Sequence, residues 1–462
     1  MPERVGLPFG KVKWATTESR GVTGDVRRAV GFFLVGALSL LAPVVHSQVS
    51  GQLAAVLTVA PFAIVALVAL ATSGGPLFEL FARTADREGG RLYGLASFAF
   101  AITGLAILLV GFGLPTAAFV AAVFALTTGN LAQALVAPRV ADPVIGTSAF
   151  AIVGTVGALG TVLGVGVLGA TAPPLFLAAF VAASGALLGA LIRSALYVRD
   201  DSLVLLSVGL LVWFLLELQP PGATAERVLV GLALTVALGY VAYALGTASV
   251  TGMLTGVLLA LFAVVLGGYG WFALLVTFFG LGGLASKYRY EEKLQRGIAQ
   301  ENEGARGSGN VLANSAVALV AVVAYAASGH VGVDATVFRF AFAGAVAAAL
   351  ADTFSSEFGG LFDTPRLITT FERVEAGTDG GVTWQGEIAG LVGSAIIAGL
   401  GGIFFEFGLV SVVVVTAAGF LGMTVDSVLG ATLEGDRLDN QSVNLLATLS
   451  AGLFAAVIAV IL

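Results

Sequence analysis

The chain has 462 residues, of which 58% are hydrophobic and only 11% are charged, and its net charge at pH 7 is −6. This composition excludes an ordinary soluble domain and indicates an integral membrane protein. The chain has no cysteine and two histidines, which excludes disulfides and thiolate metal sites and disfavours a histidine-based metal centre.

Residues 1–28 are polar and lack the apolar stretch of a cleavable signal peptide, so we expect a cytoplasmic tail there. The apolar runs that follow are each near the ~20 residues that cross a ~30 Å hydrocarbon core as a helix. They do not alternate strictly, which favours helices over a β-barrel. We therefore predict an all-α, polytopic helical bundle with about 15 transmembrane helices, near residues 29–45, 51–73, 93–112, 115–136, 148–170, 173–192, 203–217, 228–245, 249–266, 269–286, 310–328, 336–351, 386–406, 408–425 and 442–461.

The positive charges predict the orientation. With the N-terminus in the cytoplasm, the tail and six longer loops on the same side hold 20 of the 22 Lys and Arg residues. The polar clusters discussed below also fall on that side, with Asp352 and Asp426 expected just past the inner helix ends. This arrangement favours chemistry on a cytosolic substrate at a multi-pass cell-membrane protein over transport through the midplane.

We divide the membrane part into an N-terminal module, 29–197, and a C-terminal module, 198–462. In the first, residues 87–94 (REGGRLYG) and 127–132 (TTGNLA) loosely resemble motifs of the phytol and dolichol kinase group. Asn130 stands where that group has an acidic residue that would hold a metal ion. The resemblance therefore implies a degenerate partner module without phosphoryl transfer of its own.

The charged segment 287–309 connects two predicted helices, and its simplest interpretation is a solvated linker. Within it, Arg306 precedes a glycine turn that leads directly into a membrane helix, an arrangement suited to binding phosphate. Asn310 and Asn314 are four residues apart and share a face of that helix. Their amides suit either bonding between helices or contact with a ligand or metal.

A second polar segment, 352–359 (DTFSSEFG), carries Asp352, Ser356 and Glu357. In an unbroken helix the two carboxylates would point about 140° apart, but if the helix ends near Asp352 a loop can bring them together. Two carboxylates are suitable oxygen ligands for Mg²⁺. Helix capping would explain one of the two acidic residues and not easily both.

The next loop is rich in hydroxyls and glycine, which can bind phosphate through side-chain donors and backbone N–H groups. It is not a Walker A sequence, because no Gly-Lys-Ser/Thr occurs. Its candidate phosphate-binding residues are Arg366, Thr369, Thr370, Gly377, Thr378, Gly380, Gly381 and Thr383.

Asp426 follows near another inner helix end, next to Ser427. A carboxylate in such an apolar context is costly unless it is paired or bound to a metal ion. Asp439, Asn440 and Asn444 lie a short distance further on and complete the set of polar candidates.

Residues 200–462, and most specifically 304–444, resemble the DUF92 membrane family, which includes plant phytyl-phosphate kinase and eukaryotic transmembrane protein 19. The matching motifs are residues 310–314 (NVLAN), 352–359, 365–370 (PRLITT), 377–382 (GTDGGV), Gly386, 426–430 (DSVLG) and 439–444 (DNQSVN). Ala305 and Gly309 depart from the Lys and Gln expected in this type of loop, and Glu372 from a small or basic residue.

The resemblance implies a membrane prenyl-phosphate kinase that uses CTP or another nucleotide to convert a phytyl or geranylgeranyl type of monophosphate to the diphosphate. Asp352, Glu357 and Asp426 would be the catalytic, Mg²⁺-binding residues, and Arg306 and the glycine loop would bind phosphates. We expect no nucleic acid partner, and the sequence leaves a homo-oligomer open. The alternatives are a transporter or flippase of a polyprenyl carrier, and a membrane scaffold without catalysis.

Overall fold

The structure is a computed structural model that describes residues 19–196, 200–245, 249–299, 308–435 and 437–462. It is almost entirely helical, and fifteen of its described helices are long and apolar enough to span a membrane. All fifteen predicted spans are confirmed within several residues. The spanning segments are formed by α1 (Ser19–Ala37) with η1 (Leu38–Leu40) and α2 (Leu41–Gln48), α3 (Gly51–Ala71), α6 (Tyr93–Phe112), α7 (Thr116–Val136), α8 (Pro143–Val167), α9 (Leu175–Ala195), α10 (Asp201–Leu218), α11 (Ala225–Leu245), α12 (Val250–Phe262) with η2 (Ala263–Gly267), α13 (Tyr269–Lys287), α15 (Ser308–Val331), α16 (Ala335–Gly359), α17 (Trp384–Phe404), α18 (Leu409–Leu433) and α19 (Asn440–Ile461).

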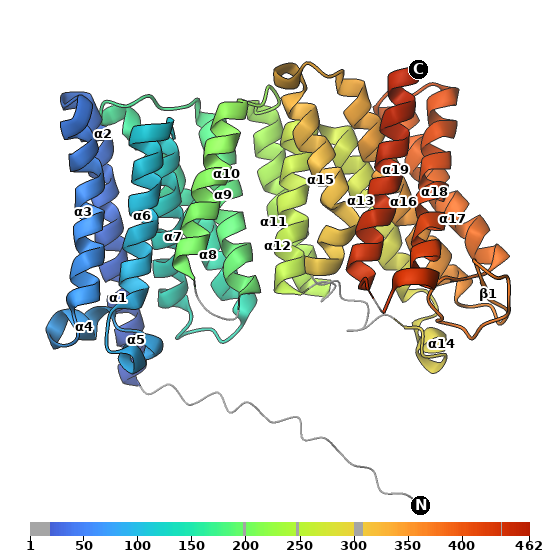
Figure 1. Cartoon of the computed structure of the whole chain (residues 1–462), viewed down its shortest axis with the longest axis horizontal. Coiled ribbons are helices and arrows are strands. Elements are labelled where there is room, and N and C mark those ends of the chain that lie inside the picture. Colours follow the sequence, from blue (N-terminus) through green and yellow to red (C-terminus); the bar gives the residue numbers. More distant parts are fainter. Residues whose placement is uncertain (1–18, 197–199, 246–248, 300–307, 436) are drawn as a thin grey trace, which may run out of the picture.

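The helices form two groups that lie side by side (Figure 1). α10 packs against α6, α7 and α9, so it belongs with the N-terminal helices. The main contact between the groups joins α12, and to a lesser extent α11, to α9. The division by packing therefore falls after α10 and before α11, further along the chain than the boundary at 197/198 taken from the sequence.

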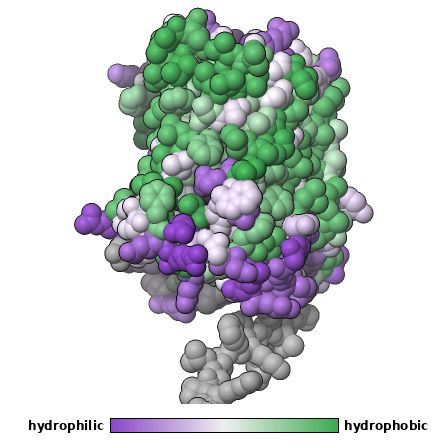
Figure 2. All heavy atoms as spheres, turned by 90° about the vertical axis from the view of Figure 1, so that its right-hand side faces the viewer, coloured by the Kyte–Doolittle hydropathy of each residue, from purple (hydrophilic) through white to green (hydrophobic). Residues whose placement is uncertain are grey.

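Short elements gather at one end of both groups: α4 (Gly75–Phe81), α5 (Thr84–Gly89), α14 (Tyr290–Gln295) and a two-stranded antiparallel sheet of β1 (Arg366–Leu367) and β2 (Gly381–Val382). Figure 2 shows that hydrophilic residues concentrate at this end of the C-terminal face, below a broad hydrophobic band. The loops rich in Lys and Arg lie at this same end. We call it the cytoplasmic end, on the charge distribution alone.

Side-chain caps define where several helices of the C-terminal group begin. Asp334 accepts from Thr336 N at 2.7 Å at the start of α16, and Asp439 accepts from Ser442 N at 2.9 Å at the start of α19. Such caps satisfy backbone donors that have no partner in the first helical turn. They fix the register of the helices that hold the candidate site.

Candidate functional site

Two aspartates meet between α16 and α18. Asp352 lies seven residues before the end of α16 at Gly359, and Asp426 lies seven residues before the end of α18 at Leu433. At 1.5 Å per residue both are about 10 Å inside the cytoplasmic helix ends. Their carboxyl groups are within hydrogen-bonding reach of each other. We call them the carboxylate pair.

The contact between the two carboxyl groups requires a positive charge between them. Two ionised carboxylates cannot hydrogen-bond to each other, so such a contact requires a proton or a cation between them. Asp426 Oδ2 is buried and has no hydrogen-bond donor among the described residues. An orphaned buried acceptor beside a second carboxylate is the arrangement expected of a cation site.

Small residues allow α16 to approach its neighbours closely enough for this contact. A Cβ added at Gly422 of α18 would lie 2.5 Å from Ala348 Cβ, and one added at Gly390 of α17 would lie 3.0 Å from Ala351 O. On the other side, a Cβ at Gly344 of α16 would lie 2.8 Å from the backbone oxygen of Ala451 in α19. Close glycine contacts are the usual way for membrane helices to pack without large side chains between them.

The expected loop between Asp352 and Glu357 is wrong, because α16 continues without a break to Gly359. No glycine or proline interrupts 352–358, and Thr353 Oγ1 donates back to Ala349 O at 2.8 Å, as hydroxyls do inside helices. Asp352 therefore lies inside a spanning helix and not just past its end, and the same holds for Asp426.

Glu357 has a different partner. Its Oε2 accepts from Lys293 Nζ at 2.6 Å, and the same ammonium donates to Ala285 O at 2.8 Å. Lys293 is 1% exposed and Glu357 is 5% exposed. This buried ion pair joins α14 to the end of α16 and gives Glu357 Oε2 a partner outside the carboxylate pair, while Glu357 Oε1 is buried without a hydrogen-bond partner among the described residues.

Sequence reasoning missed Lys293, because one lysine among several charges in a linker gives no signal of burial. Among the described residues, no three His, Cys, Asp or Glu side chains form a group that could hold a metal ion. A divalent cation at the carboxylate pair would therefore take its remaining ligands from water and substrate phosphate, as Mg²⁺ commonly does.

The glycine loop, residues 377–381, packs on α18 next to the pair. Gly380 has φ +72°, and a Cβ added there would lie 2.5 Å from Ser427 O. Ser427 directly follows Asp426, and its own hydroxyl donates to Met423 O at 3.3 Å. The backbone of the loop therefore packs directly against α18 beside the pair, at a position that only glycine tolerates.

The side chains of this region mostly bond within the protein. Arg366 donates to Phe371 O at 2.7 Å, Thr378 donates to Glu375 O at 2.8 Å, and Thr383 accepts from Gly386 N at 3.1 Å as the cap of α17. Thr370 accepts a longer contact from Glu372 N at 3.4 Å. The structure thus gives these predicted phosphate ligands local roles, while Thr369 and Ser356 are exposed.

Asparagine pairs begin two neighbouring helices at the cytoplasmic end. Asn314 Nδ2 donates to Asn310 O at 3.0 Å in α15, and Asn444 Nδ2 donates to Asn440 Oδ1 at 3.0 Å in α19. The helices pack together, and Gly309 lies against Gln441. The shared helix face predicted for Asn310 and Asn314 is confirmed, and Asn440 and Asn444 form a second pair of the same kind. Arg306, the cation predicted beside this turn, lies outside the described residues.

Glu434, which sequence reasoning also missed, ends α18 beside the glycine loop. Burial raises the pKa of its carboxyl, and the nearby negative charge of Asp379 raises it further. Asn440 donates a hydrogen bond to Glu434, which opposes the rise. Asp439 nearby is the opposite case, because its hydrogen bonds to Ser442 lower its pKa. The cytoplasmic mouth of the site is therefore acidic.

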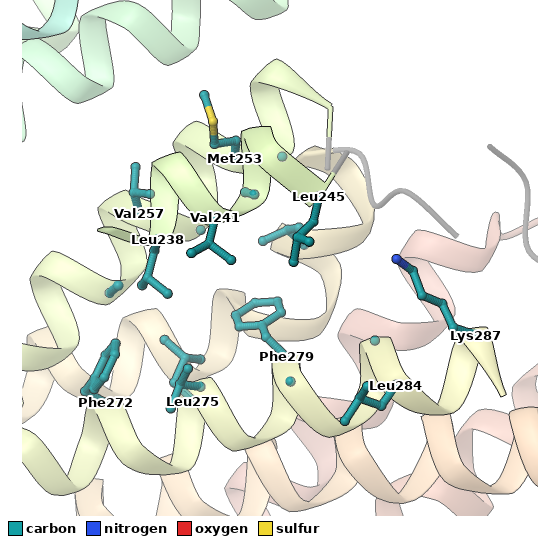
Figure 3. Close-up of a pocket in the computed structure, with 18 residues that line it drawn as sticks. Leu238, Val241, Leu245, Met253, Val257, Phe272, Leu275, Phe279, Leu284 and Lys287 are labelled. Atoms are coloured by element: carbon teal, nitrogen blue, oxygen red, sulfur yellow. The ribbon is translucent and has the colours of Figure 1, made fainter. Parts of the chain in front are cut away.

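An apolar groove of ≈ 470 Å³ runs along α13 between α11 and α12 (Figure 3). Phe272 lies toward one end and Lys287 lies at the other, which is the cytoplasmic end. Fifteen residues of helix separate them, or about 22 Å at 1.5 Å per residue. The rest of the lining is apolar and includes Leu238, Val241, Leu245, Met253, Val257, Leu275, Phe279 and Leu284.

Comparison with known proteins identifies the family to which the helices α11–α19 are similar. The family model described as "Integral membrane protein DUF92" matches residues 233–452, which begins in α11 and ends in α19. An uncharacterized membrane protein of Methanocaldococcus jannaschii is 37% identical over 199 residues, covering 41% of this chain and 77% of that protein. The protein VTE6, chloroplastic, of Arabidopsis thaliana is 29% identical over 194 residues, covering 40% of this chain and 57% of that protein.

An uncharacterized membrane protein of Synechocystis is 30% identical over 193 residues, which cover 38% of this chain and 69% of that protein. The chain thus spans little more than half of the Arabidopsis relative and over two thirds of the other two. No solved structure matches the chain.

Proposed function

Because this chain belongs to the DUF92 family of integral membrane proteins, we propose that its α11–α19 unit is a prenyl-phosphate kinase. The proposed reaction transfers the γ-phosphoryl group of CTP to a phytyl or geranylgeranyl type of monophosphate. A phosphate oxygen of the lipid forms the new bond to the γ-phosphorus, the bond to the β-phosphate oxygen breaks, and CDP leaves. The family resemblance supplies this reaction class, and the site geometry supports it.

The observation that most supports the proposal is the carboxylate pair beside the glycine loop. Asp352 and Asp426 would hold Mg²⁺ between their carboxylates, where the metal ion neutralises charge on the phosphates. Asp426 Oδ2, which lacks a donor among the described residues, fits this role. The glycine loop packs on α18 beside the pair, and its backbone would supply N–H groups to phosphate oxygens.

The groove along α13 suits the lipid substrate. Its apolar lining takes an uncharged hydrocarbon chain, and Lys287 at the cytoplasmic end offers an ammonium to the lipid phosphate. Pockets that bind apolar ligands commonly combine such a lining with few polar groups that fix orientation. Arg306, outside the described residues, remains the proposed cation for the nucleotide.

One observation favours a second candidate, a transporter or flippase of a polyprenyl phosphate. The carboxylate pair lies about 10 Å inside two spanning helices, and buried acidic residues in spans are typical of ion-coupled transport. Under this alternative the pair would bind a coupling proton or cation, and no nucleotide would be consumed.

Reconstituted vesicles separate the two candidates. Purified protein is placed in vesicles that contain geranylgeranyl phosphate, and lipid products and leaflet distribution are measured with and without CTP and Mg²⁺. The kinase proposal predicts diphosphate formation that requires nucleotide. Movement of unmodified lipid phosphate without nucleotide, and no diphosphate with it, would replace the kinase by the transporter.

A further inference from the structure

A polar cavity lies at the cytoplasmic end of the N-terminal group, outside the residues that match the family. Its volume is ≈ 630 Å³, within the range of small-molecule sites. Its walls come from α1, the link between α4 and α5, α7, α9 and α10. The charged lining residues are Asp25, Arg28, Arg83, Arg193 and Asp201.

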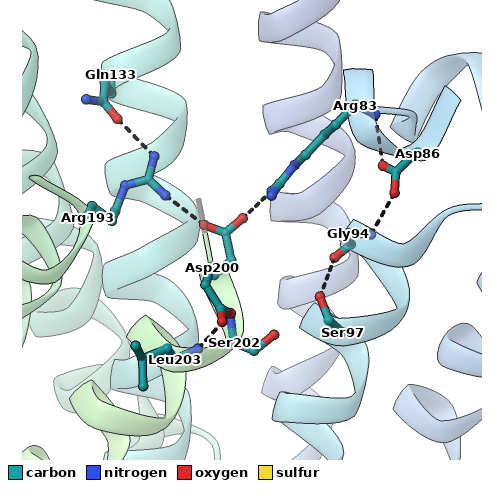
Figure 4. Close-up of polar contacts among 10 residues, drawn as sticks. Arg83, Asp86, Gly94, Ser97, Gln133, Arg193, Asp200, Ser202 and Leu203 are labelled. Atoms are coloured by element: carbon teal, nitrogen blue, oxygen red, sulfur yellow. Dashed lines mark hydrogen bonds and ion pairs between the residues drawn. The ribbon is translucent and has the colours of Figure 1, made fainter. Parts of the chain in front are cut away.

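One buried carboxylate organises two of the arginines. Asp201, which is 3% exposed, accepts from Arg193 at 2.7 Å and also from Arg83. Arg193 donates in addition to Gln133 Oε1 at 3.0 Å. Figure 4 shows the two guanidinium groups converging, that of Arg193 from α9 and that of Arg83 from the link between α4 and α5. Asp201 thus holds two cations in fixed positions.

Each arginine is also supported from its other side. The Arg83 guanidinium lies 5.2 Å from the centre of the Phe32 ring, and that of Arg193 lies 5.2 Å from the centre of the Phe150 ring. Asp86 accepts from the backbone N–H of Arg83 at 2.9 Å, which fixes the link that carries it. When packing and hydrogen bonds already hold the cations in position, the free-energy cost of ordering them on ligand binding is lower.

Arginines outnumber aspartates in the cavity lining. It holds three arginines and two aspartates, and the buried carboxylate of Asp86 lies beside Arg83, outside the lining. Arg28, the third arginine, is paired with Asp25 on α1. At the edge of a hydrocarbon core a guanidinium group attracts an anion more strongly than it would in water.

The side-chain amide of Asn130, in the cavity wall, has an oxygen without a hydrogen bond. Asn130 Oδ1 is buried and has no hydrogen-bond partner among the described residues. The oxygen and nitrogen of an asparagine amide can exchange places, so Asn130 can offer an acceptor or a donor to a ligand. Buried polar atoms without a partner are rare in folded proteins, and a bound ligand is one common explanation.

We propose that this cavity binds the phosphate group of a phosphorylated ligand, between Arg28 and the pair of arginines held by Asp201. Arginine guanidinium groups match phosphate oxygens in geometry and charge. The cavity has room for more than a phosphate, and Asn130 meets the attached moiety. The site is separate from the carboxylate pair and does not depend on the function proposed for α11–α19.

Binding to the detergent-solubilised full-length protein tests the proposal by calorimetry. Three probes identify the source of the phosphate group: inorganic phosphate, CTP, and geranylgeranyl phosphate in micelles. We expect at least one probe to bind, and Arg28→Gln to weaken that binding about tenfold or more, because a charge-assisted hydrogen bond is lost. Arg28 is chosen because the buried contacts of Asp201 stay intact.

Two further variants complete the design. Asn130→Asp keeps the size of the side chain and adds a negative charge, so it should also weaken the binding that is sensitive to Arg28. Arg87→Gln is the matched control, since Arg87 is half exposed, pairs with Glu79 and does not line the cavity. Failure of all three probes to bind, or equal binding to wild type and Arg28→Gln, would overturn the proposal.

Discussion

The two aspartates of the carboxylate pair stand out in the sequence because each is an acidic residue beside apolar helix residues. That signal singles out Asp352 and Asp426, and the family resemblance places both in one Mg²⁺ site although they are 74 residues apart. Contact between α16 and α18 brings them together. Glu357 gave an equally strong signal, and its partner is Lys293.

The pair provides the first prediction. Asp352→Asn and Asp426→Asn should each lower phosphoryl transfer about 10³-fold or more, because either change removes a charge that holds the metal ion. Glu217→Gln is the control, since Glu217 lies in α10 and accepts only from Trp213 in the described structure. Near-normal turnover in both aspartate variants, measured with labelled CTP, would remove the pair from the site.

A second prediction concerns the buried ion pair. Glu357→Gln should lower thermal stability, by about 3 kcal/mol, because it leaves the Lys293 ammonium buried without its counter-charge. Combining Glu357→Leu with Lys293→Met should recover most of that loss, since both charges are removed together. Thermal unfolding in detergent measures both effects. A stable Glu357→Gln protein that has lost activity would instead return Glu357 to the catalytic group.

A third prediction follows from the raised pKa of Glu434. A carboxyl whose pKa is higher in the folded state than in the unfolded state favours folding when protonated, so this contribution is present below its ordinary pKa and is lost as pH rises. Thermal unfolding temperature should therefore fall less steeply from acidic to neutral pH in Glu434→Gln than in wild type. Parallel curves for the two proteins would contradict this account of the acidic mouth.

At the scale of elements, helix existence was predictable and helix ends were not. Fifteen apolar runs gave fifteen spanning helices, because the bilayer requires each run to satisfy its own backbone hydrogen bonds. The end of α16 was misplaced by eight residues, 351 against 359, because polar side chains in 352–359 resemble a loop. Within this stretch Glu357 pairs with Lys293, Thr353 bonds back to its own helix, and Asp352 lies beside Asp426 of α18.

The groove along α13 makes a prediction about chain length. Gly280 lines the groove, and a Cβ added there would meet no atom within 4 Å, so Gly280→Leu should fill space that the lipid chain needs. We expect the KM for geranylgeranyl phosphate to rise about tenfold, with a smaller change for geranyl phosphate. Gly399→Leu is the matched control, because Gly399 of α17 is equally open and lies outside the groove lining.

Equal effects of Gly280→Leu on both chain lengths would contradict the assignment of the groove. So would an effect of the same size in Gly399→Leu, since that would reflect general disturbance of the membrane helices.

For the whole molecule, the positive-inside rule predicted which loops share an end of the bundle, and the packing bears out that common end. The division into two modules was approximate, because composition does not change at the boundary while packing does. The spanning segments of both groups have a similar apolar composition. The cavity around Asp201 was not predicted at all, since its arginines come from segments far apart in the sequence: α1, the link between α4 and α5, and α9.

Orientation supplies a whole-molecule prediction. The chain has no cysteine, so single cysteines can be introduced without interference. Asp379→Cys, in the exposed glycine loop, should react with a membrane-impermeant maleimide only from the cytosolic side. His330→Cys, exposed near the opposite end of α15, should react only from outside. Labelling of the position 379 variant from outside would rule out a cytosolic nucleotide.

The central claim is that α11–α19 transfers a phosphoryl group to a prenyl phosphate at the carboxylate pair. Its most direct test is mass analysis of the lipid after purified protein, CTP, Mg²⁺ and geranylgeranyl phosphate are combined in detergent, with Asp426→Asn assayed in parallel. The account predicts geranylgeranyl diphosphate and an equal amount of CDP from wild type and almost none from Asp426→Asn. Unchanged lipid monophosphate in the wild-type reaction, with CTP and with ATP, would contradict it.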